Sequence, residues 1–199
     1  MARTLLPSLL VGTIAAIPAS ASAIDCKAVK TKTEKAICKS GELVRLDENL
    51  NHVYRAAVLK SVAPESLKAD QKRWISETRD QCGTSACLTA AYLAQINRLS
   101  SGMATWCESN KPRIAGVWSR IGEDGFFEQF SAGPDGTFDS WLHHRPETSG
   151  SWALKGCDLV ISSHTGMRVE WKLVDLAKSE LRVIELGSTG LARYRRSSR

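Results

Sequence analysis

The sequence predicts an α+β protein, in which a small disulfide-bonded helical domain precedes an antiparallel β meander or small barrel. Three observations predict this fold class. Apolar residues recur every three or four positions up to about residue 102, whereas apolar and polar residues alternate from residue 116 onward. The first pattern is the period of a helix and the second that of a half-buried strand. The third observation is an even number of cysteines, which favours disulfides in an exported chain.

The beginning of the chain has the features of a secretory signal peptide. Arg3 precedes an apolar stretch, and residues 21–23 (Ala-Ser-Ala) have the small-x-small pattern of a cleavage site. We expect cleavage after Ala23, with cleavage after Ala21 as the rival, and therefore a periplasmic or secreted protein. No apolar run reaches the roughly 18 residues of a transmembrane helix, so no transmembrane anchor is expected.

The change of period divides the expected mature chain into two domains. We expect the signal peptide over residues 1–23, the helical domain over 24–105, a linker over 106–115, the β domain over 116–196 and a tail over 197–199.

Six cysteines lie in the expected mature chain: Cys26, Cys38, Cys82, Cys87, Cys107 and Cys157. Their spacing contains no C-x₂-C pair, and no paired histidine is near, so we interpret them as three disulfides rather than metal ligands. We favour pairs between sequence neighbours, which would join the last two cysteines to each other across the two domains. The rival scheme joins Cys38 to Cys82 at the open end of a helical hairpin.

Four helices are predicted, over residues 31–38, 42–61, 64–81 and 84–102. The first begins with the capping-box spacing of Thr31 and Glu34, and the third has Pro64 in its first turn. Because the link near residues 62–63 is short, the second and third helices should be antiparallel neighbours.

This hairpin places polar residues of the two helices opposite one another. Asn51 faces Trp74, and two pairs should fix the register of the helices: an ion pair between Asp47 and Arg79, and a hydrogen bond between Tyr54 and Gln71. A solvent-facing patch for a partner is the alternative interpretation. We favour the structural role, because each polar group then has a partner.

A set of residues at fixed spacing runs through the helical domain. It comprises the first four cysteines with Glu34, Asp47, Asn51, Tyr54, Gln71, Trp74 and Arg79. Over residues 25–100 this pattern resembles the lysozyme inhibitor LprI-like N-terminal domain family. The resemblance implies a disulfide-bonded helical domain of exported bacterial proteins, lysozyme inhibition by some members, and no catalytic residues. We interpret the motif residues as structural.

Charge provides a physical test of the inhibitor hypothesis. The helical half has a small positive excess, and many lysozymes are strongly cationic, so a local acidic patch would have to face the partner. Glu42, Asp47 and Glu48 offer such a patch at the start of the second helix. Acidic residues are also favoured at any helix N-terminus, which is the simpler explanation.

The second half contains eight short candidate strands separated by turn residues. They cover residues 117–121, 126–132, 137–144, 151–154, 159–163, 167–173, 181–186 and 192–195. Strands at this spacing favour a meander that curls or closes, because closure removes exposed edges.

The β domain opens with Gly116-Val117-Trp118 and carries Arg193 on its last strand. This arrangement weakly resembles lipocalin-like barrels, in which a G-x-W packs against an arginine near the end. We name Trp118, Trp152, Trp171 and Arg193 as core or ligand-lining residues. The first reading is that the tryptophans fill the core, and the alternative is that they line a site for a small hydrophobic ligand.

No catalytic residue, metal site or cofactor is predicted. Adjacent histidines on a strand point to opposite faces, so His143, His144 and His164 do not suggest a metal site. Asp124, Glu128 and Asp139 fit ordinary turn and surface positions. The basic excess, 27 Lys and Arg against 21 Asp and Glu, is spread along the chain and predicts no nucleic-acid surface.

We therefore expect an exported binding protein of the bacterial cell envelope, not an enzyme, of the lysozyme inhibitor LprI-like type. Its expected partner is a lysozyme or another envelope protein. The alternative is a lipocalin-like binder of a small hydrophobic ligand through the β domain, and a structural envelope factor is a third option. The sequence leaves the oligomeric state open.

Overall fold

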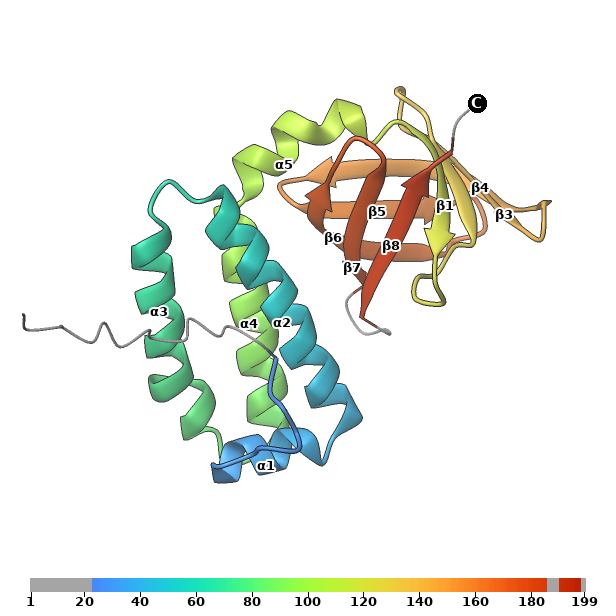
Figure 1. Ribbon diagram of the computed structural model, residues 1–199. Coiled ribbons are helices and arrows are strands. Elements are labelled where there is room, and N and C mark those ends of the chain that lie inside the picture. Colours follow the sequence, from blue (N-terminus) through green and yellow to red (C-terminus); the bar gives the residue numbers. More distant parts are fainter. Residues whose placement is uncertain (1–22, 186–189, 198–199) are drawn as a thin grey trace, which may run out of the picture.

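The computed structural model describes residues 23–185 and 190–197 of the chain. The expected signal peptide, apart from Ala23, lies outside these residues, as do the last two residues of the expected tail. The fold class is confirmed: a disulfide-bonded helical region is followed by a closed antiparallel β-barrel (Figure 1).

Five α-helices build the helical region. They are α1 (Lys32–Cys38), α2 (Gly41–Lys60), α3 (Pro64–Glu77), α4 (Ser85–Gly102) and α5 (Ala104–Asn110), with 3₁₀ turns at Arg79–Gln81 and Lys111–Arg113. The predicted capping box at Thr31 is present, and the side chains of Ser40 and Thr84 cap α2 and α4. The segment 106–115, expected to be a linker, is largely helical, because α5 and the second 3₁₀ turn occupy it.

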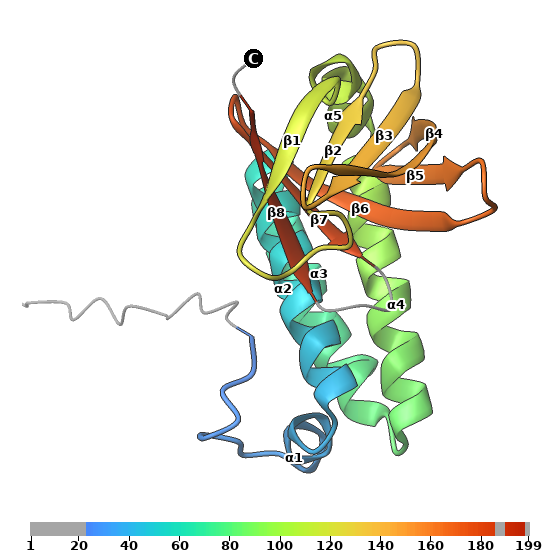
Figure 2. The ribbon, with the colours of Figure 1, turned by 90° about the vertical axis from the view of Figure 1, so that its right-hand side faces the viewer.

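The helices α2, α3 and α4 form a bundle, and α1 lies across its end far from the barrel (Figures 1 and 2). The closest partner of α2 is α4 rather than its sequence neighbour α3. Both α2 and α4 bury an apolar face, whereas Gln71 is the one buried residue of α3. The expected packing of a two-helix hairpin is therefore replaced by a three-helix arrangement.

The second half is an eight-stranded barrel in which each strand pairs with its neighbours in sequence. The strands are β1 (Gly116–Ile121), β2 (Gln129–Ala132), β3 (Thr137–Leu142), β4 (Arg145–Lys155), β5 (Asp158–Ser163), β6 (Arg168–Leu176), β7 (Glu180–Glu185) and β8 (Leu191–Arg196). Pairing of β1 with β8 closes the ring, so no strand edge is left open. The prediction that the meander closes is thereby confirmed.

Aromatic side chains fill the barrel. Trp118, Phe127, Phe130, Phe138, Trp171 and Tyr194 are all buried. The rings of Phe127, Phe130, Phe138, Trp171 and Tyr194 touch in a continuous cluster, with centroids 4.9 Å apart for Phe127 and Phe138 and 5.0 Å apart for Phe130 and Tyr194. Rings at these distances leave little space between them, so the barrel interior is a packed core.

The two regions are joined by a covalent bond and by packing. A disulfide links Cys107 of α5 to Cys157 in the turn between β4 and β5. Lys60, at the end of α2, forms an ion pair with Asp175 of β6 at 3.1 Å and lies 4.2 Å from the ring centroid of Trp106. The buried apolar residues of both regions belong to one continuous core. The boundary between two domains therefore remains a prediction from the sequence.

Candidate functional site

Asp47, one of the motif residues at fixed spacing, is buried in the helical bundle. Its side chain is on α2, and the residue is 9% exposed. One carboxylate oxygen accepts a hydrogen bond of 2.8 Å from the hydroxyl of Tyr92 on α4. The other oxygen accepts one of 2.7 Å from the backbone N–H of Ile24. Burial and the neighbouring Asp47 carboxylate raise the pKa of Tyr92, so its hydroxyl keeps the proton that it donates.

The predicted ion pair between Asp47 and Arg79 is wrong. Arg79 lies in the 3₁₀ turn after α3, and its guanidinium binds Asp80 through Nε at 2.9 Å and Nη2 at 2.8 Å. The prediction assumed that α2 faces α3 alone. Because α4 packs against α2, Tyr92 takes the position beside Asp47 that was assigned to the arginine.

The predicted hydrogen bond between Tyr54 and Gln71 is wrong for the same reason. The amide of Gln95 on α4 donates to the side-chain oxygen of Gln71 at 2.7 Å, and Arg98 donates to Gln95 at 3.0 Å. Tyr54 is buried without a bond to Gln71, and burial raises the pKa of its hydroxyl. The buried polar side chain of α3, Gln71, therefore contacts α4 rather than α2.

The other motif residues also make internal contacts. Trp74, expected opposite Asn51, packs edge-on against Tyr92 with ring centroids 5.6 Å apart. Glu34 accepts hydrogen bonds from the backbone N–H groups of Thr31 and Lys30, which lower the pKa of its carboxyl. These contacts support the interpretation of the motif as structural.

A shallow groove runs beside these contacts, between α3 and α4. It has a volume of about 320 Å³. Its lining residues are Asp70, Arg73, Trp74, Glu77, Thr78, Gln95 and Arg98. Charges of both signs line this groove, so it has no clear preference for a cationic or an anionic partner.

The expected acidic patch on α2 is smaller than the sequence suggested. Glu42 and Glu48 are exposed, but Asp47 is buried and its two oxygens accept internal hydrogen bonds. Glu42 lies in the first turn of α2, where any helix favours a carboxylate, whereas Glu48 lies beyond that turn. They form no dedicated surface for a cationic protein.

The G-x-W segment packs against an arginine of the last strand, but that arginine is Arg196 rather than Arg193. The guanidinium of Arg196 lies 4.3 Å from the ring centroid of Trp118 and donates a hydrogen bond of 2.8 Å to the carbonyl of Ala115. Trp118 is fully buried and donates to the carbonyl of Ile114 at 2.8 Å. A side chain at Gly116, where φ is +151°, would place its Cβ 2.1 Å from Arg196 Nη1.

The alternation of inward and outward residues along β8 could have identified Arg196 as the arginine that packs against Trp118. Ala192 and Tyr194 are buried, so every second residue of β8 faces inward, and Arg196 follows that series. Arg193 faces solvent instead, where it donates to Glu180 at 3.0 Å. Hydrogen bonds from Arg193 and Arg182 hold the pKa of Glu180 at about 2.

The remaining named tryptophans belong to the core of the barrel. Trp171 contacts Phe127 and Phe130 within the aromatic cluster. Trp152 is buried and donates to the carbonyl of Gly133 at 2.9 Å. Neither of the two pockets that stand out on the molecule lies among these rings.

The β3–β4 hairpin projects from the barrel on the side away from the helices (Figure 1). Its turn consists of His143 and His144, both with positive φ (50° and 64°), between the paired residues Leu142 and Arg145. A two-residue turn of this conformation is type I′, where Asn-Gly is the usual choice. Glu128 accepts a hydrogen bond of 3.1 Å from the backbone of His143 and lies 3.3 Å from its Nδ1 atom.

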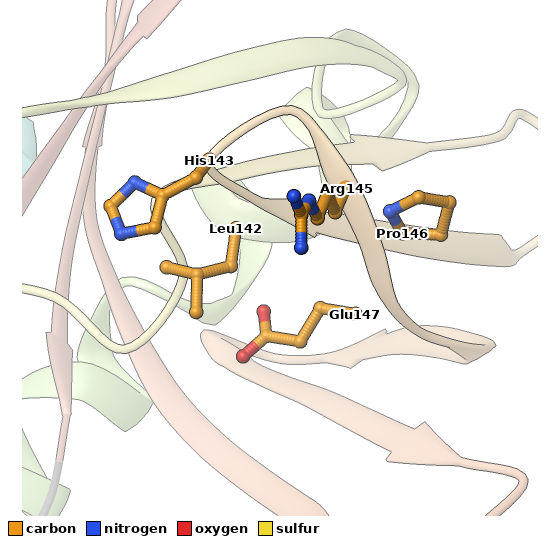
Figure 3. A pocket seen from close by; sticks show the side chains of 5 residues that line it. All are labelled: Leu142, His143, Arg145, Pro146 and Glu147. Atoms are coloured by element: carbon orange, nitrogen blue, oxygen red, sulfur yellow. The ribbon is translucent and has the colours of Figure 1, made fainter.

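A hollow of about 480 Å³ lies against this hairpin, lined by Leu142, His143, Arg145, Pro146 and Glu147. Figure 3 shows Leu142 and Glu147 on the same side of the hairpin, with the imidazole of His143 beyond Leu142. Leu142 is 45% exposed, and both histidines and Arg145 are exposed. The tip therefore combines an exposed apolar side chain with two imidazoles, the guanidinium of Arg145 and the exposed carboxylate of Glu147.

The helical region matches a known protein family. Residues 26–114 match the family described as lysozyme inhibitor LprI. The match confirms the resemblance read from residues 25–100 and extends through α5. It ends before β1, so the barrel lies outside the LprI match. A comparison with curated proteins gave no match.

Two features concern the cellular location of the protein: its disulfides and the hydropathy of its helices. The pairs are Cys26–Cys38, Cys82–Cys87 and Cys107–Cys157, the scheme favoured from the sequence. Disulfide bonds indicate an extracytoplasmic protein. Within residues 23–185 and 190–197, no helix combines the length and the apolar character needed to span a membrane.

Proposed function

We propose that this chain is an exported binding protein of the bacterial cell envelope that inhibits a lysozyme. The observation that carries the proposal is the match of residues 26–114 to the lysozyme inhibitor LprI family. Three disulfides and the cleavage pattern before Ile24 support a periplasmic or secreted location.

The contacts of the polar motif residues are more consistent with a binding protein than with an enzyme. The motif residues Asp47, Gln71 and Arg79 bond to other side chains of the bundle, and none of them faces an open cavity with a second reactive group. Protein inhibitors act by occupying a site on their target, for which a rigid and internally satisfied scaffold is suitable.

We assign the contact with lysozyme to the β3–β4 hairpin. This hairpin lies outside the residues that match the family, so the assignment rests on the chemistry of the hairpin and not on the match. Many lysozymes are cationic overall, but the substrate cleft of the type case contains a pair of catalytic carboxylates. A narrow hairpin fits a cleft better than a helix bundle does, and His143, His144 and Arg145 complement those carboxylates. Two carboxylates also lie at the hairpin: Glu128 contacts His143, and Glu147 accepts a hydrogen bond from Ser140 but is exposed.

Inhibition of cell-wall lysis by the purified mature chain tests the function. We expect a concentration-dependent loss of lysozyme activity on suspended bacterial cell walls at micromolar concentrations of the oxidised protein. A panel should include lysozymes of different structural types, because the family match does not specify one. Unchanged lysis rates across the panel at micromolar excess would refute the proposal.

The double substitution His143→Asn/His144→Gly tests the assigned surface. It introduces the preferred residues of a type I′ turn, so the melting temperature should be unchanged or raised, while both imidazoles are lost. Inhibition should weaken at least tenfold. The matched control is His164→Asn, which removes an exposed histidine from the β5–β6 turn.

The alternative, a lipocalin-like binder of a small hydrophobic ligand, has less support. The closed barrel and the packing of Arg196 on Trp118 favour it, but aromatic rings fill the interior where a ligand would lie. Saturable quenching of tryptophan fluorescence by a fatty acid at micromolar concentration would restore this alternative.

A further inference from the structure

We propose that cleavage after Ala23 creates a buried ion pair, in which the new α-ammonium group of Ile24 binds the carboxylate of Asp47. The backbone nitrogen of Ile24 lies 2.7 Å from Asp47 Oδ2, which is already the distance of a charge-assisted hydrogen bond. The side chain of Ile24 packs against the hydrophobic core and holds this nitrogen in place. The inference does not depend on lysozyme binding.

The charge around Asp47 is unbalanced without such a cation. The two groups that donate hydrogen bonds to its carboxylate are the neutral hydroxyl of Tyr92 and the neutral amide of Ile24. Arg79 is close enough to act on Asp47 electrostatically, but its guanidinium is bound to Asp80, which neutralises it. Among the residues that the structure describes, no ion pair reaches the carboxylate of Asp47. A buried carboxylate without a counter-charge is costly.

Cleavage supplies the missing charge at the correct atom. Hydrolysis of the Ala23–Ile24 peptide bond adds one water molecule, leaves a carboxylate on Ala23 and an amine on Ile24, and the amine takes up a proton at neutral pH. A neutral amide with one N–H group thereby becomes a cation with three. The nitrogen need not move, because it already lies against the carboxylate.

The position of the cleavage site therefore matters for the fold. Cleavage after Ala21 would leave Ser22 as the first residue, and the nitrogen of Ile24 would remain an amide. Cleavage after Ala23 is the alternative that gives Asp47 its ion pair. Asp47 would then have a role that its spacing in the motif does not reveal: it binds the mature N-terminus to α2 and, through Tyr92, to α4.

The first experiment compares the melting temperatures of three oxidised chains at pH 6. One begins at Ile24, one retains Ala23, and one begins at Ile24 with an acetylated α-amine. The acetylated chain keeps the N–H donor but loses the charge, so it separates the ion pair from the hydrogen bond. We expect both blocked chains to melt about 5–15 °C below the chain with the free amine. Equal melting temperatures would overturn the inference.

The variant Asp47→Asn is the matched control, because it keeps the shape of the side chain and removes its charge. In this background the free and acetylated chains should have the same melting temperature. A difference as large as that in the wild type would mean that another group binds the ammonium, which would also overturn the inference.

A second measurement does not require any variant to fold. We expect NMR titration of the wild-type mature chain to give an α-amino pKa at least one unit above the ordinary value of about 8. The other ionisable groups facing the pair are Tyr92 from α4 and Arg79 with Asp80 from the 3₁₀ turn. Because the folded pKa is raised, the stabilisation is complete below about pH 8 and is lost as the pH rises through the folded pKa. An ordinary pKa, or exported protein that begins at Ser22 by intact mass, would contradict the proposal.

Discussion

The helical region and the barrel bury different kinds of side chain. Buried polar residues are frequent in the helices, where Asp47, Gln71, Arg79 and Gln95 make specific contacts, whereas the barrel interior is an aromatic cluster. A polar contact requires a particular partner at a particular angle, and an aromatic core requires volume and shape. Directional hydrogen bonds therefore arrange the three helices of the bundle, whereas non-directional packing of aromatic rings fills the barrel.

The same difference explains where the covalent links lie. Two of the three disulfides are within the helical region, and the third joins that region to the barrel. The helices bury fewer large apolar side chains, and α3 buries almost none. The barrel needs no internal disulfide, because a closed sheet pairs its own edges.

The largest expected effect is the loss of an aromatic ring from the barrel. Phe130 is fully buried and contacts four other rings directly, so Phe130→Ala should lower the free energy of unfolding by about 3–5 kcal/mol. Urea denaturation followed by tryptophan fluorescence measures this change. The control is Phe126→Ala, which truncates a ring that is 48% exposed and should cost much less. Similar losses for the two variants would mean that the barrel interior is not tightly packed.

The second prediction concerns the covalent link between the regions. The Cys107–Cys157 bond closes a loop of 50 residues, and Cys82–Cys87 closes one of 5. The chain-entropy relation then makes the first bond more stabilising by about 2 kcal/mol. Replacing each pair by serines and measuring unfolding in urea tests this difference. If the inter-region variant also shows separate transitions by far-ultraviolet circular dichroism and by fluorescence, the two regions fold independently without the link.

How much of this architecture is predictable from sequence also differs between the regions. The alternating pattern is local, so it predicts eight strands and the closed barrel, but it starts β4 at residue 151 rather than at Arg145 and places His143 and His144 on a strand, whereas they form a turn. Arg196 could have been identified by continuing the alternation of β8. The polar pairs of the helices are not local. Asp47 and Gln71 could be assigned to Tyr92 and Gln95 only with the knowledge that α4 packs against both α2 and α3. The left-handed turn at His143 and His144 could not be predicted from sequence either, because histidines are not the residues that type I′ turns prefer.

A double-mutant cycle on the two glutamines tests the directional character of the helical contacts. Gln71→Leu removes the acceptor of the Gln95 amide and leaves a buried donor unpaired, which should cost about 1–3 kcal/mol. Adding Gln95→Leu should recover part of that loss, because an apolar pair replaces an unpaired amide. Chemical denaturation of the single and double variants gives the coupling energy. Strict additivity would mean that the pair has no mutual contribution.

The smallest expected effect lies on the outer surface of the barrel, at Glu180 of β7. Its carboxylate binds Arg182 at 2.7 Å and Arg193 at 3.0 Å, which hold its pKa at about 2, below the ordinary value of 4.5. Because the folded pKa is depressed, these bonds stabilise the protein fully above about pH 4.5, and the contribution is lost as the pH falls toward 2. The side chain is 22% exposed and both arginines face solvent, so screening limits the contribution to at most about 1 kcal/mol.

Glu180→Gln should therefore lower the melting temperature by a few degrees at pH 7 and have no effect at pH 2. Glu170→Gln is the control, since its ion pair with Arg168 is more than half exposed on both sides and should contribute nothing measurable. If Glu180→Gln lowered the free energy of unfolding as much as Phe130→Ala does, the proposed difference between the helical region and the barrel would be wrong. Such a loss would show that the barrel depends on directional polar contacts at its surface as strongly as on the aromatic rings in its interior.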